Sequence, residues 1–161
     1  MGAAHLRPYT AADRAACLAI FDSNVPGFFA PDARAGFAAY LDGAGARYLV
    51  LADADGAIVG CGGFGIRADG TTATLRWGMV LATHHRRGLG RQLTLARLRL
   101  AVADRAIARV VLYTTGQTAD FYRRLGFRDT AVLAEHYGPG LDQHAMAAAV
   151  DDAFRRRLAA G

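Results

Sequence analysis

The sequence predicts an α/β (α+β) fold in which a mixed, mostly antiparallel sheet is flanked by about four helices. Two observations lead to this prediction. Apolar, strand-like runs joined by short turns fill residues 47–81, which is the pattern of consecutive antiparallel strands. A long helical pattern over 88–104 then precedes a continuous apolar run at 109–114, which suits a buried strand that is parallel to its neighbour after a crossover helix.

The length and composition indicate one globular domain. The chain has 161 residues, 53% hydrophobic and 20% charged, so we expect a single domain over 1–161 with its own core. All 19 basic residues are arginine, and the net charge of +5 permits an acidic ligand or nucleic acid. The arginines are spread along the chain, and we interpret the triplet at 155–157 as a solvated face.

The cysteines and the hydropathy pattern indicate a compartment. Cys17 and Cys61 are isolated in sequence and lack metal-ligand spacing, which suggests reduced thiols in a cytoplasmic protein. The N-terminus has no apolar leader, and no run approaches the ~18 residues of a membrane span. We therefore expect a cytoplasmic protein with no membrane partner.

The first half of the chain is expected to hold two helices and four strands. Thr10 suits the cap of the first helix, with Asp13 in its first turn, and Pro31 suits the first turn of the second helix. Gly56 and Gly70 mark turns between strands. The expected elements are a strand at 5–9, helices at 11–21 and 32–41, and strands at 47–53, 57–66 and 71–81.

The expected strand at 57–66 is rich in glycine, which is costly in the interior of a strand. Such glycines usually mark a bulge, a twist or the close approach of another backbone. The glycines are Gly60, Gly62, Gly63 and Gly65.

The second half alternates helices and strands. Leu89, Leu93, Ala96 and Leu100 recur at helical spacing. Gly126 fits the position just after a short helix. The expected elements are a helix at 88–104, a strand at 109–114, a helix at 117–125 and strands at 128–135 and 143–150.

The junction between the strand at 71–81 and the next helix has the features of a phosphate-binding loop. Gly88 and Gly90 lie where the helix begins, and there the first N–H groups lack intrahelical partners and the helix dipole is positive. A leucine at the third glycine position excludes the dinucleotide fingerprint, and the absence of lysine excludes a Walker-type loop.

This junction resembles motif A of the GNAT acyltransferases, [Q/R]-x-x-G-x-[G/A], with His85 in place of the leading Gln or Arg. Residues 114–127 are similar to motif B of that family. Tyr122-x-x-x-Gly126-Phe127 matches position by position, without the usual Asn in the preceding loop. The expected order of elements is also the GNAT order over about residues 6–150, so the chain resembles a bacterial single-domain GNAT N-acetyltransferase.

The resemblance implies acetyl-CoA as cosubstrate and direct transfer of its acetyl group to a primary amine. The pyrophosphate would lie on the N–H groups at 86–91, and the pantetheine arm would add to the edge of the strand at 71–81 where it separates from 109–114. Backbone N–H groups near Gly78, where a bulge is expected, could stabilise the oxyanion. The implied cofactor-binding residues are Gly78, Met79, Val80, Arg86, Arg87, Gly88, Leu89, Gly90, Arg91 and Gln117.

The resemblance makes Tyr122 the candidate general acid, because a phenol near the sulfur can donate a proton to the leaving thiolate. The alternative is that Tyr122 only packs against the sheet. Glu135 is the candidate base, with His136, His84 and Asp22 as alternatives. No set of residues has convincing metal-ligand spacing, so no metal is expected.

The acceptor is expected to be a small primary amine or an amino-acid-like molecule, bound by the loops at 22–31 and 135–142. Phe28, Phe29 and Tyr137 are the candidate substrate-binding residues, although the two phenylalanines could instead plug the core. The alternative functions are a peptide or protein N-acetyltransferase, an acyltransferase that uses a longer acyl donor, and a catalytically silent CoA-binding module. Nucleic-acid binding is a further alternative, but no aromatic residues are interleaved with the arginines to support it. A homodimer through the last strands or the tail at 151–158 is also open.

Overall fold

The computed structural model describes residues 3–161. The strands are β1 (His5–Pro8), β2 (Tyr48–Ala52), β3 (Ile58–Ile66), β4 (Thr72–Val80), β5 (Arg109–Thr115), β6 (Arg128–Leu133) and β7 (Gln143–Ala149). The α-helices are α1 (Arg14–Ser23), α2 (Arg34–Asp42), α3 (Leu89–Val102), α4 (Gly116–Arg124) and α5 (Asp152–Ala160), and 3-10 turns at Ala11–Asp13 and Pro31–Ala33 precede α1 and α2. Every predicted strand and helix is therefore present, in the predicted order.

The strands form a seven-stranded sheet in the order β1-β2-β3-β4-β5-β7-β6. The pairs β1–β2, β2–β3, β5–β7 and β6–β7 are antiparallel, whereas β4 and β5 are parallel, with Thr72 opposite Arg109. The prediction of a mixed, mostly antiparallel sheet with a buried parallel strand after the crossover is confirmed.

Residues 3–161 hold five α-helices, in agreement with the prediction of about four, and the additional helix, α5, is formed by the C-terminal tail. The Asp151 carboxylate caps this helix by accepting a hydrogen bond from the Phe154 N–H at 2.8 Å. Phe154 and Leu158, one helical turn apart, are both buried. No helix within residues 3–161 is long and apolar enough to cross a membrane.

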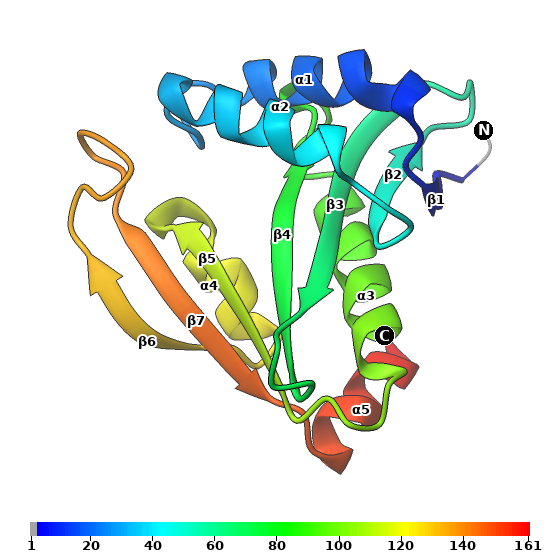
Figure 1. Ribbon diagram of the computed structural model, residues 1–161, viewed down its shortest axis with the longest axis vertical. Coiled ribbons are helices and arrows are strands. Elements are labelled where there is room, and N and C mark those ends of the chain that lie inside the picture. Colours follow the sequence, from blue (N-terminus) through cyan, green and yellow to red (C-terminus); the bar gives the residue numbers. More distant parts are fainter. Residues whose placement is uncertain (1–2) are drawn as a thin grey trace. The chain divides into compact units, whose positions relative to one another are not determined.

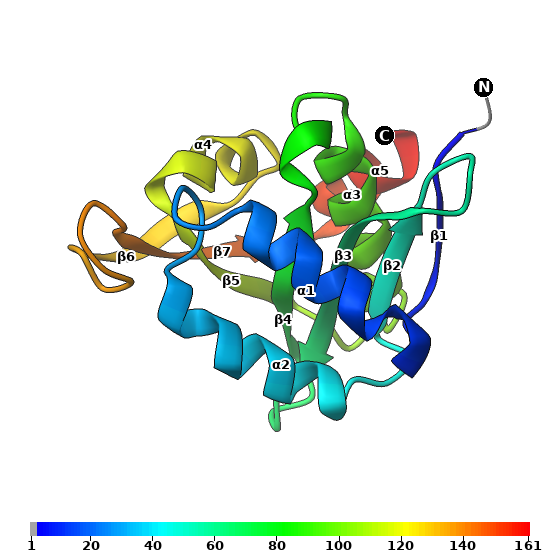
Figure 2. The ribbon, with the colours of Figure 1, turned by 90° about the horizontal axis from the view of Figure 1, so that it is seen from above.

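The chain divides into two compact units, residues 1–64 with 76–97 and residues 65–75 with 98–161. In the first unit, α1 and α2 cover one face of β2 and β3, and α3 lies on the other face (Figures 1 and 2). In the second unit, α4 packs against β5 and β7.

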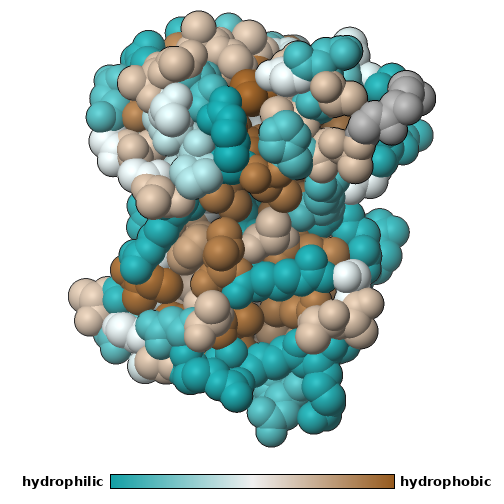
Figure 3. All heavy atoms as spheres, turned by 90° about the vertical axis from the view of Figure 1, so that its right-hand side faces the viewer, coloured by the Kyte–Doolittle hydropathy of each residue, from teal (hydrophilic) through white to brown (hydrophobic). Residues whose placement is uncertain are grey.

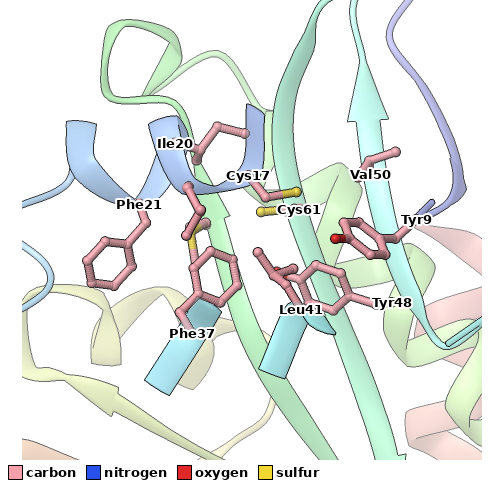
Figure 4. Packing of buried hydrophobic residues seen from close by; sticks show 11 residues of the cluster. Tyr9, Cys17, Ile20, Phe21, Phe37, Leu41, Tyr48, Val50 and Cys61 are labelled. Carbon is pink, nitrogen blue, oxygen red and sulfur yellow. The ribbon is translucent and has the colours of Figure 1, made fainter. Parts of the chain in front are cut away.

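The core of the first unit is aromatic and contains both cysteines (Figure 4). Phe37 is fully buried and stacks on Phe21, with ring centroids 5.7 Å apart. Cys17 on α1 and Cys61 on β3 are free, fully buried and face each other through their sulfurs. The two cysteines are isolated in sequence, and the fold brings them together. Burial raises the pKa of the Cys61 thiol well above its usual value, which suits a core residue rather than a nucleophile.

The buried face of α3 differs from the predicted one. Leu100, which belonged to the predicted apolar stripe, is 51% exposed, whereas Leu93, Thr94, Arg97 and Leu98 are buried. The helix is therefore rotated from the orientation that its leucine spacing predicts, and a charged side chain, Arg97, occupies the buried face.

The second unit confirms the predicted end of α4. Gly126 has φ +101° just after the helix, where glycine adopts the left-handed conformation without a Cβ penalty. Phe127 is buried and its N–H donates to the Tyr122 carbonyl at 3.1 Å.

The arginine triplet was predicted to be a solvated face, and this is correct for Arg156 and Arg157, which are exposed. Arg155 instead donates to the carbonyl oxygens of Val102, at the end of α3, and Ile107. On the face shown in Figure 3, hydrophilic residues dominate the lower edge.

The start of the chain is joined to α1 through Asp13. Both carboxylate oxygens accept hydrogen bonds from the Arg7 guanidinium at 2.8 Å, and one also accepts from the Thr10 N–H at 2.9 Å. Asp13 is only 6% exposed. These hydrogen bonds, with Arg7 first, lower the pKa of Asp13 to about 2.

We predict that Asp13→Asn lowers the free energy of unfolding at pH 7 by about 2 kcal/mol, the equivalent of this pKa shift. Because the folded pKa lies below the unfolded value, the stabilisation is present above about pH 4 and is lost as the pH falls toward 2. Urea unfolding from pH 7 to pH 2 measures both effects. Asp42→Asn is the control, because the Arg14–Asp42 pair is largely exposed and should contribute under about 1 kcal/mol. Equal losses for the two variants would contradict the prediction.

Candidate active site

The loop that follows β4 is fastened to the end of α1. The buried Asn24 side chain donates to the Val80 carbonyl oxygen at 2.9 Å, and the Ser23 hydroxyl accepts from the Ala82 N–H at 3.1 Å. His85, which departs from motif A, turns back so that its Nε2 lies 2.9 Å from the same Val80 oxygen. The substitution therefore anchors the loop to the strand. Sequence reasoning missed Ser23 and Asn24, because no local pattern links them to a strand more than fifty residues away.

The two adjacent aromatics of the loop at 22–31 lie in different surroundings. Phe29 packs on the core and stacks on Phe21, with centroids 4.9 Å apart. The half-buried Phe28 ring instead meets the His85 ring edge to face at 5.2 Å. Phe29 thus packs into the core, as the alternative interpretation of this pair expected, while Phe28 contacts the loop of motif A.

The loop and the first turn of α3 form a backbone suited to an anion. Arg86 and Gly88 have φ of +61° and +79°, both in the left-handed region. The Gln92 N–H donates to the Gly88 carbonyl at 3.0 Å, so the helix begins there and the N–H groups at 88–91 have no acceptor within the helix. The side chains of Arg86, Arg87 and Arg91 are exposed beside this turn. Together these groups can bind a pyrophosphate.

β4 is irregular close to the position where a bulge was expected. Trp77 has φ +45°, which is rare for a residue other than glycine inside a strand, so the irregularity begins one residue before Gly78. The buried Tyr48 hydroxyl donates to the Trp77 carbonyl oxygen at 2.8 Å. This contact fixes the orientation of the peptide that leads into the segment of Gly78, Met79 and Val80.

In the second unit, the end of β5 and helix α4 carry the side chains of motif B. Thr114 and Thr118 are hydrogen-bonded to each other, and Gln117 is exposed. Tyr122 is half-buried, with its ring edge-on to Phe121 at 5.0 Å and to Phe127 at 5.8 Å. The tyrosine ring is therefore held between two aromatic neighbours.

A cluster that the sequence did not indicate lies beside α4. Asp129 accepts from Arg123 at 2.6 Å and lies 2.8 Å from His144 Nδ1. The hydrogen bond from His144, and then those from Arg123, lower the pKa of Asp129. His144 Nε2 would lie 3.3 Å from a Cβ at Gly116, so the ring abuts the first residue of α4. Arg123, Asp129 and His144 come from α4, β6 and β7, and no sequence motif links them.

The loop at 135–142 is held by its own polar groups. Glu135 is exposed, lies two residues beyond the end of β6 and accepts a hydrogen bond from the Gly140 N–H at 3.2 Å. Tyr137 is half-buried and accepts from Gln143 Nε2 at 3.0 Å, and its burial raises the pKa of its hydroxyl.

Two of the alternative bases have partners. Asp22 is ion-paired with Arg34 at 2.8 Å, and His84 Nδ1 lies 3.0 Å from the Thr83 hydroxyl. Across residues 3–161, no three His, Cys, Asp or Glu side chains gather as a metal ion would require.

Comparison with known proteins points to one family. The family model described as "Acetyltransferase (GNAT) domain" matches residues 44–129. No curated protein matches the sequence. Two solved structures share the fold at low identity. Ard1 from Thermoplasma volcanium has a TM-score of 0.77 and 21% identity, over 94% of this chain and 100% of that one. The ribosomal-protein-S18-alanine N-acetyltransferase from Escherichia coli has a TM-score of 0.72 and 22% identity, over 92% and 94%.

A third solved structure, yncA from Salmonella typhimurium, contains its cofactor acetyl-CoA. It has a TM-score of 0.69 and 25% identity, over 94% of this chain and 96% of that one.

We predict that Gly88→Ala destabilises the protein and Gly90→Ala does not, although the two glycines are only two residues apart. Gly88 has φ +79°, so a Cβ there should cost about 1–2 kcal/mol. Gly90 lies in α3 and its added Cβ would meet nothing closer than 3.9 Å, so Gly90→Ala should leave stability unchanged or raise it by up to about 1 kcal/mol. Urea unfolding of both variants measures this difference, and similar destabilisation by the two would contradict it.

Proposed function

Because the chain belongs to the GNAT acetyltransferase family, we propose that it transfers the acetyl group of acetyl-CoA directly to the primary amine of a small molecule or an amino-acid-like acceptor. The observation that carries this proposal is the anion-binding turn at the start of α3. In this turn, Arg86 and Gly88 have left-handed backbone conformations, and the N–H groups of the first helical turn have no acceptor within the helix. Such a backbone is suited to a pyrophosphate.

The assignment of the cofactor-binding residues follows from this turn. The N–H groups from Arg86 to Arg91 would hold the pyrophosphate, and the exposed arginine side chains would add charge. Gln117, on the first turn of α4, would contact the cofactor arm. Gly78, Met79 and Val80 would present backbone N–H groups to the thioester, and the fixed Trp77 peptide before them supports that role.

Chemically, the acceptor amine attacks the thioester carbonyl carbon, and the C–S bond then breaks. Negative charge develops first on the carbonyl oxygen, where backbone N–H groups stabilise it, and then on the departing sulfur. Tyr122 would donate its phenolic proton to that sulfur. Support for this role comes from the two aromatic contacts that hold the ring.

For the proton that leaves the amine, we propose Glu135, an exposed carboxylate that could act through water. The acceptor loops would be those at 22–31 and 135–142. Phe28 and Tyr137, both half-buried, are the aromatic side chains that we propose for acceptor binding, with Phe29 supporting Phe28 from the core.

We predict that acetyl-CoA raises the thermal stability of the protein, because a ligand that binds only the folded state stabilises it. At 100 times its Kd the gain is about 2.7 kcal/mol. Differential scanning fluorimetry with acetyl-CoA, CoA and ATP measures the effect, and ATP should give none. Release of free thiol with a panel of primary amines then tests turnover. No shift at millimolar acetyl-CoA would refute the proposed function, and a shift without thiol release would indicate a silent CoA-binding module.

We predict that Tyr122→Phe keeps the affinity for acetyl-CoA within about threefold but lowers kcat by 10²-fold or more, the usual contribution of a general acid. Tyr113→Phe is the matched control, because the Tyr113 hydroxyl is on an exposed side chain and contacts Arg67. This control should retain full turnover. Equal kcat values for the two variants would leave Tyr122 with a packing role only.

A further inference from the structure

One charged side chain lies where a core residue is expected. Arg97, in the middle of α3, is 2% exposed and is among the largest fully buried side chains. Its Nη1 donates to the Gly63 carbonyl oxygen at 3.4 Å and its Nη2 to the Thr94 hydroxyl at 3.2 Å, while its Nε has no partner. None of the salt bridges among residues 3–161 includes Arg97.

This arrangement is unfavourable for stability. A guanidinium has five N–H donors, and Arg97 has two long hydrogen bonds to neutral acceptors. Burying a charge without a counter-ion removes its hydration, and hydrogen bonds to neutral acceptors compensate for only a small part of that free-energy cost. Replacement of buried charged groups by apolar side chains of similar volume is often neutral or stabilising. The packing of the core therefore does not explain why the chain holds an arginine at this position.

The glycines of β3 and β4 make room for the guanidinium. A Cβ at Gly78 would lie 2.5 Å from Nη2 of Arg97, and one at Gly62 would lie 3.2 Å from its Nε. The guanidinium is therefore pressed against the bare backbone of β4 at Gly78. This contact also accounts for two of the glycines whose presence in strands is otherwise costly.

The guanidinium of Arg97 lies against the irregular part of β4. The neighbouring Trp77 peptide is fixed from the α1 and α2 face by the Tyr48 hydroxyl, and Arg97 supports Gly78 from the α3 face. Burial raises the pKa of Tyr48 well above its usual value, so the hydroxyl keeps the proton that it donates to the Trp77 carbonyl oxygen.

We propose that Arg97 is a positioning residue whose buried charge, fixed behind the backbone of Gly78, stabilises the negative charge that develops on the thioester oxygen. This inference rests on the proposed acetyl transfer. Arg97 does not touch the reacting atoms. It acts because a fixed charge in a water-excluded core is screened little and needs no reorganisation during the reaction.

The experiment compares Arg97→Met, which removes the charge but keeps an unbranched chain, with Arg97→Lys, which keeps the charge. Arg99→Met is the matched control, because Arg99 is an exposed arginine on the same helix that donates to the Leu158 and Gly161 carbonyls. For each protein we would measure the urea midpoint, the Kd of acetyl-CoA, kcat and the infrared carbonyl band of bound acetyl-CoA labelled with ¹³C at the carbonyl.

For Arg97→Met we expect an unchanged or higher urea midpoint, a Kd within threefold of the wild-type value and at least a tenfold loss of kcat. The carbonyl band should move to higher wavenumber, because less positive potential polarises the C=O bond. Arg97→Lys should retain more of the kcat, and Arg99→Met all of it.

Arg97→Met with a lower midpoint but wild-type kcat and carbonyl band would overturn the proposal, since that result is expected from a residue that only packs. If Arg97→Met does not fold, Arg97→Gln replaces it, and equal kcat for Arg97→Gln and Arg97→Lys would overturn the proposal. A wild-type protein that neither binds acetyl-CoA nor releases CoA would overturn the proposed function itself, and this inference with it.

Discussion

The carbonyl oxygen of Val80 is the point at which the candidate site is joined to the core. It accepts from the buried Asn24 amide and lies within hydrogen-bond distance of His85, so the end of β4, the end of α1 and the loop before α3 meet at one atom. A loop that must bind an anion through its backbone needs its peptides fixed beforehand, because ordering them on binding would cost conformational entropy. Asn24 is itself buried and also donates to the Ile20 carbonyl oxygen at 2.8 Å, so the end of α1 holds the loop.

The order of elements and the ends of helices could be predicted because they depend on local chemistry. Gly126 after α4 and the proline before α2 act through backbone dihedral angles, which neighbouring residues determine. Helix α5 was not predicted, although its pattern is local. A capping aspartate precedes two apolar residues that lie one helical turn apart. That pattern is short and follows the region of resemblance, so it was interpreted as a tail.

What the sequence could not predict depends on contacts between distant segments. The spacing of leucines in α3 indicated a stripe that includes Leu100, but the helix buries Arg97 and leaves Leu100 exposed. The glycines that admit Arg97 come from β3 and β4, and the Asp129–His144 contact joins β6 to β7. Motif A correctly placed the turn before α3, whereas the partners that fix this turn, Ser23 and Asn24, have no motif.

The pair of sulfurs between α1 and β3 has a consequence for the motions of the first unit. Cys17 and Cys61 are both inaccessible, and burial keeps the Cys61 thiol protonated, so neither should react with an alkylating reagent while α1 lies on the sheet. Their modification then requires α1 to separate from β3, at least locally. Because α1 also carries Ser23 and Asn24, the rate of thiol labelling reports how often the loop before α3 loses its anchor, with no foreign probe in the protein.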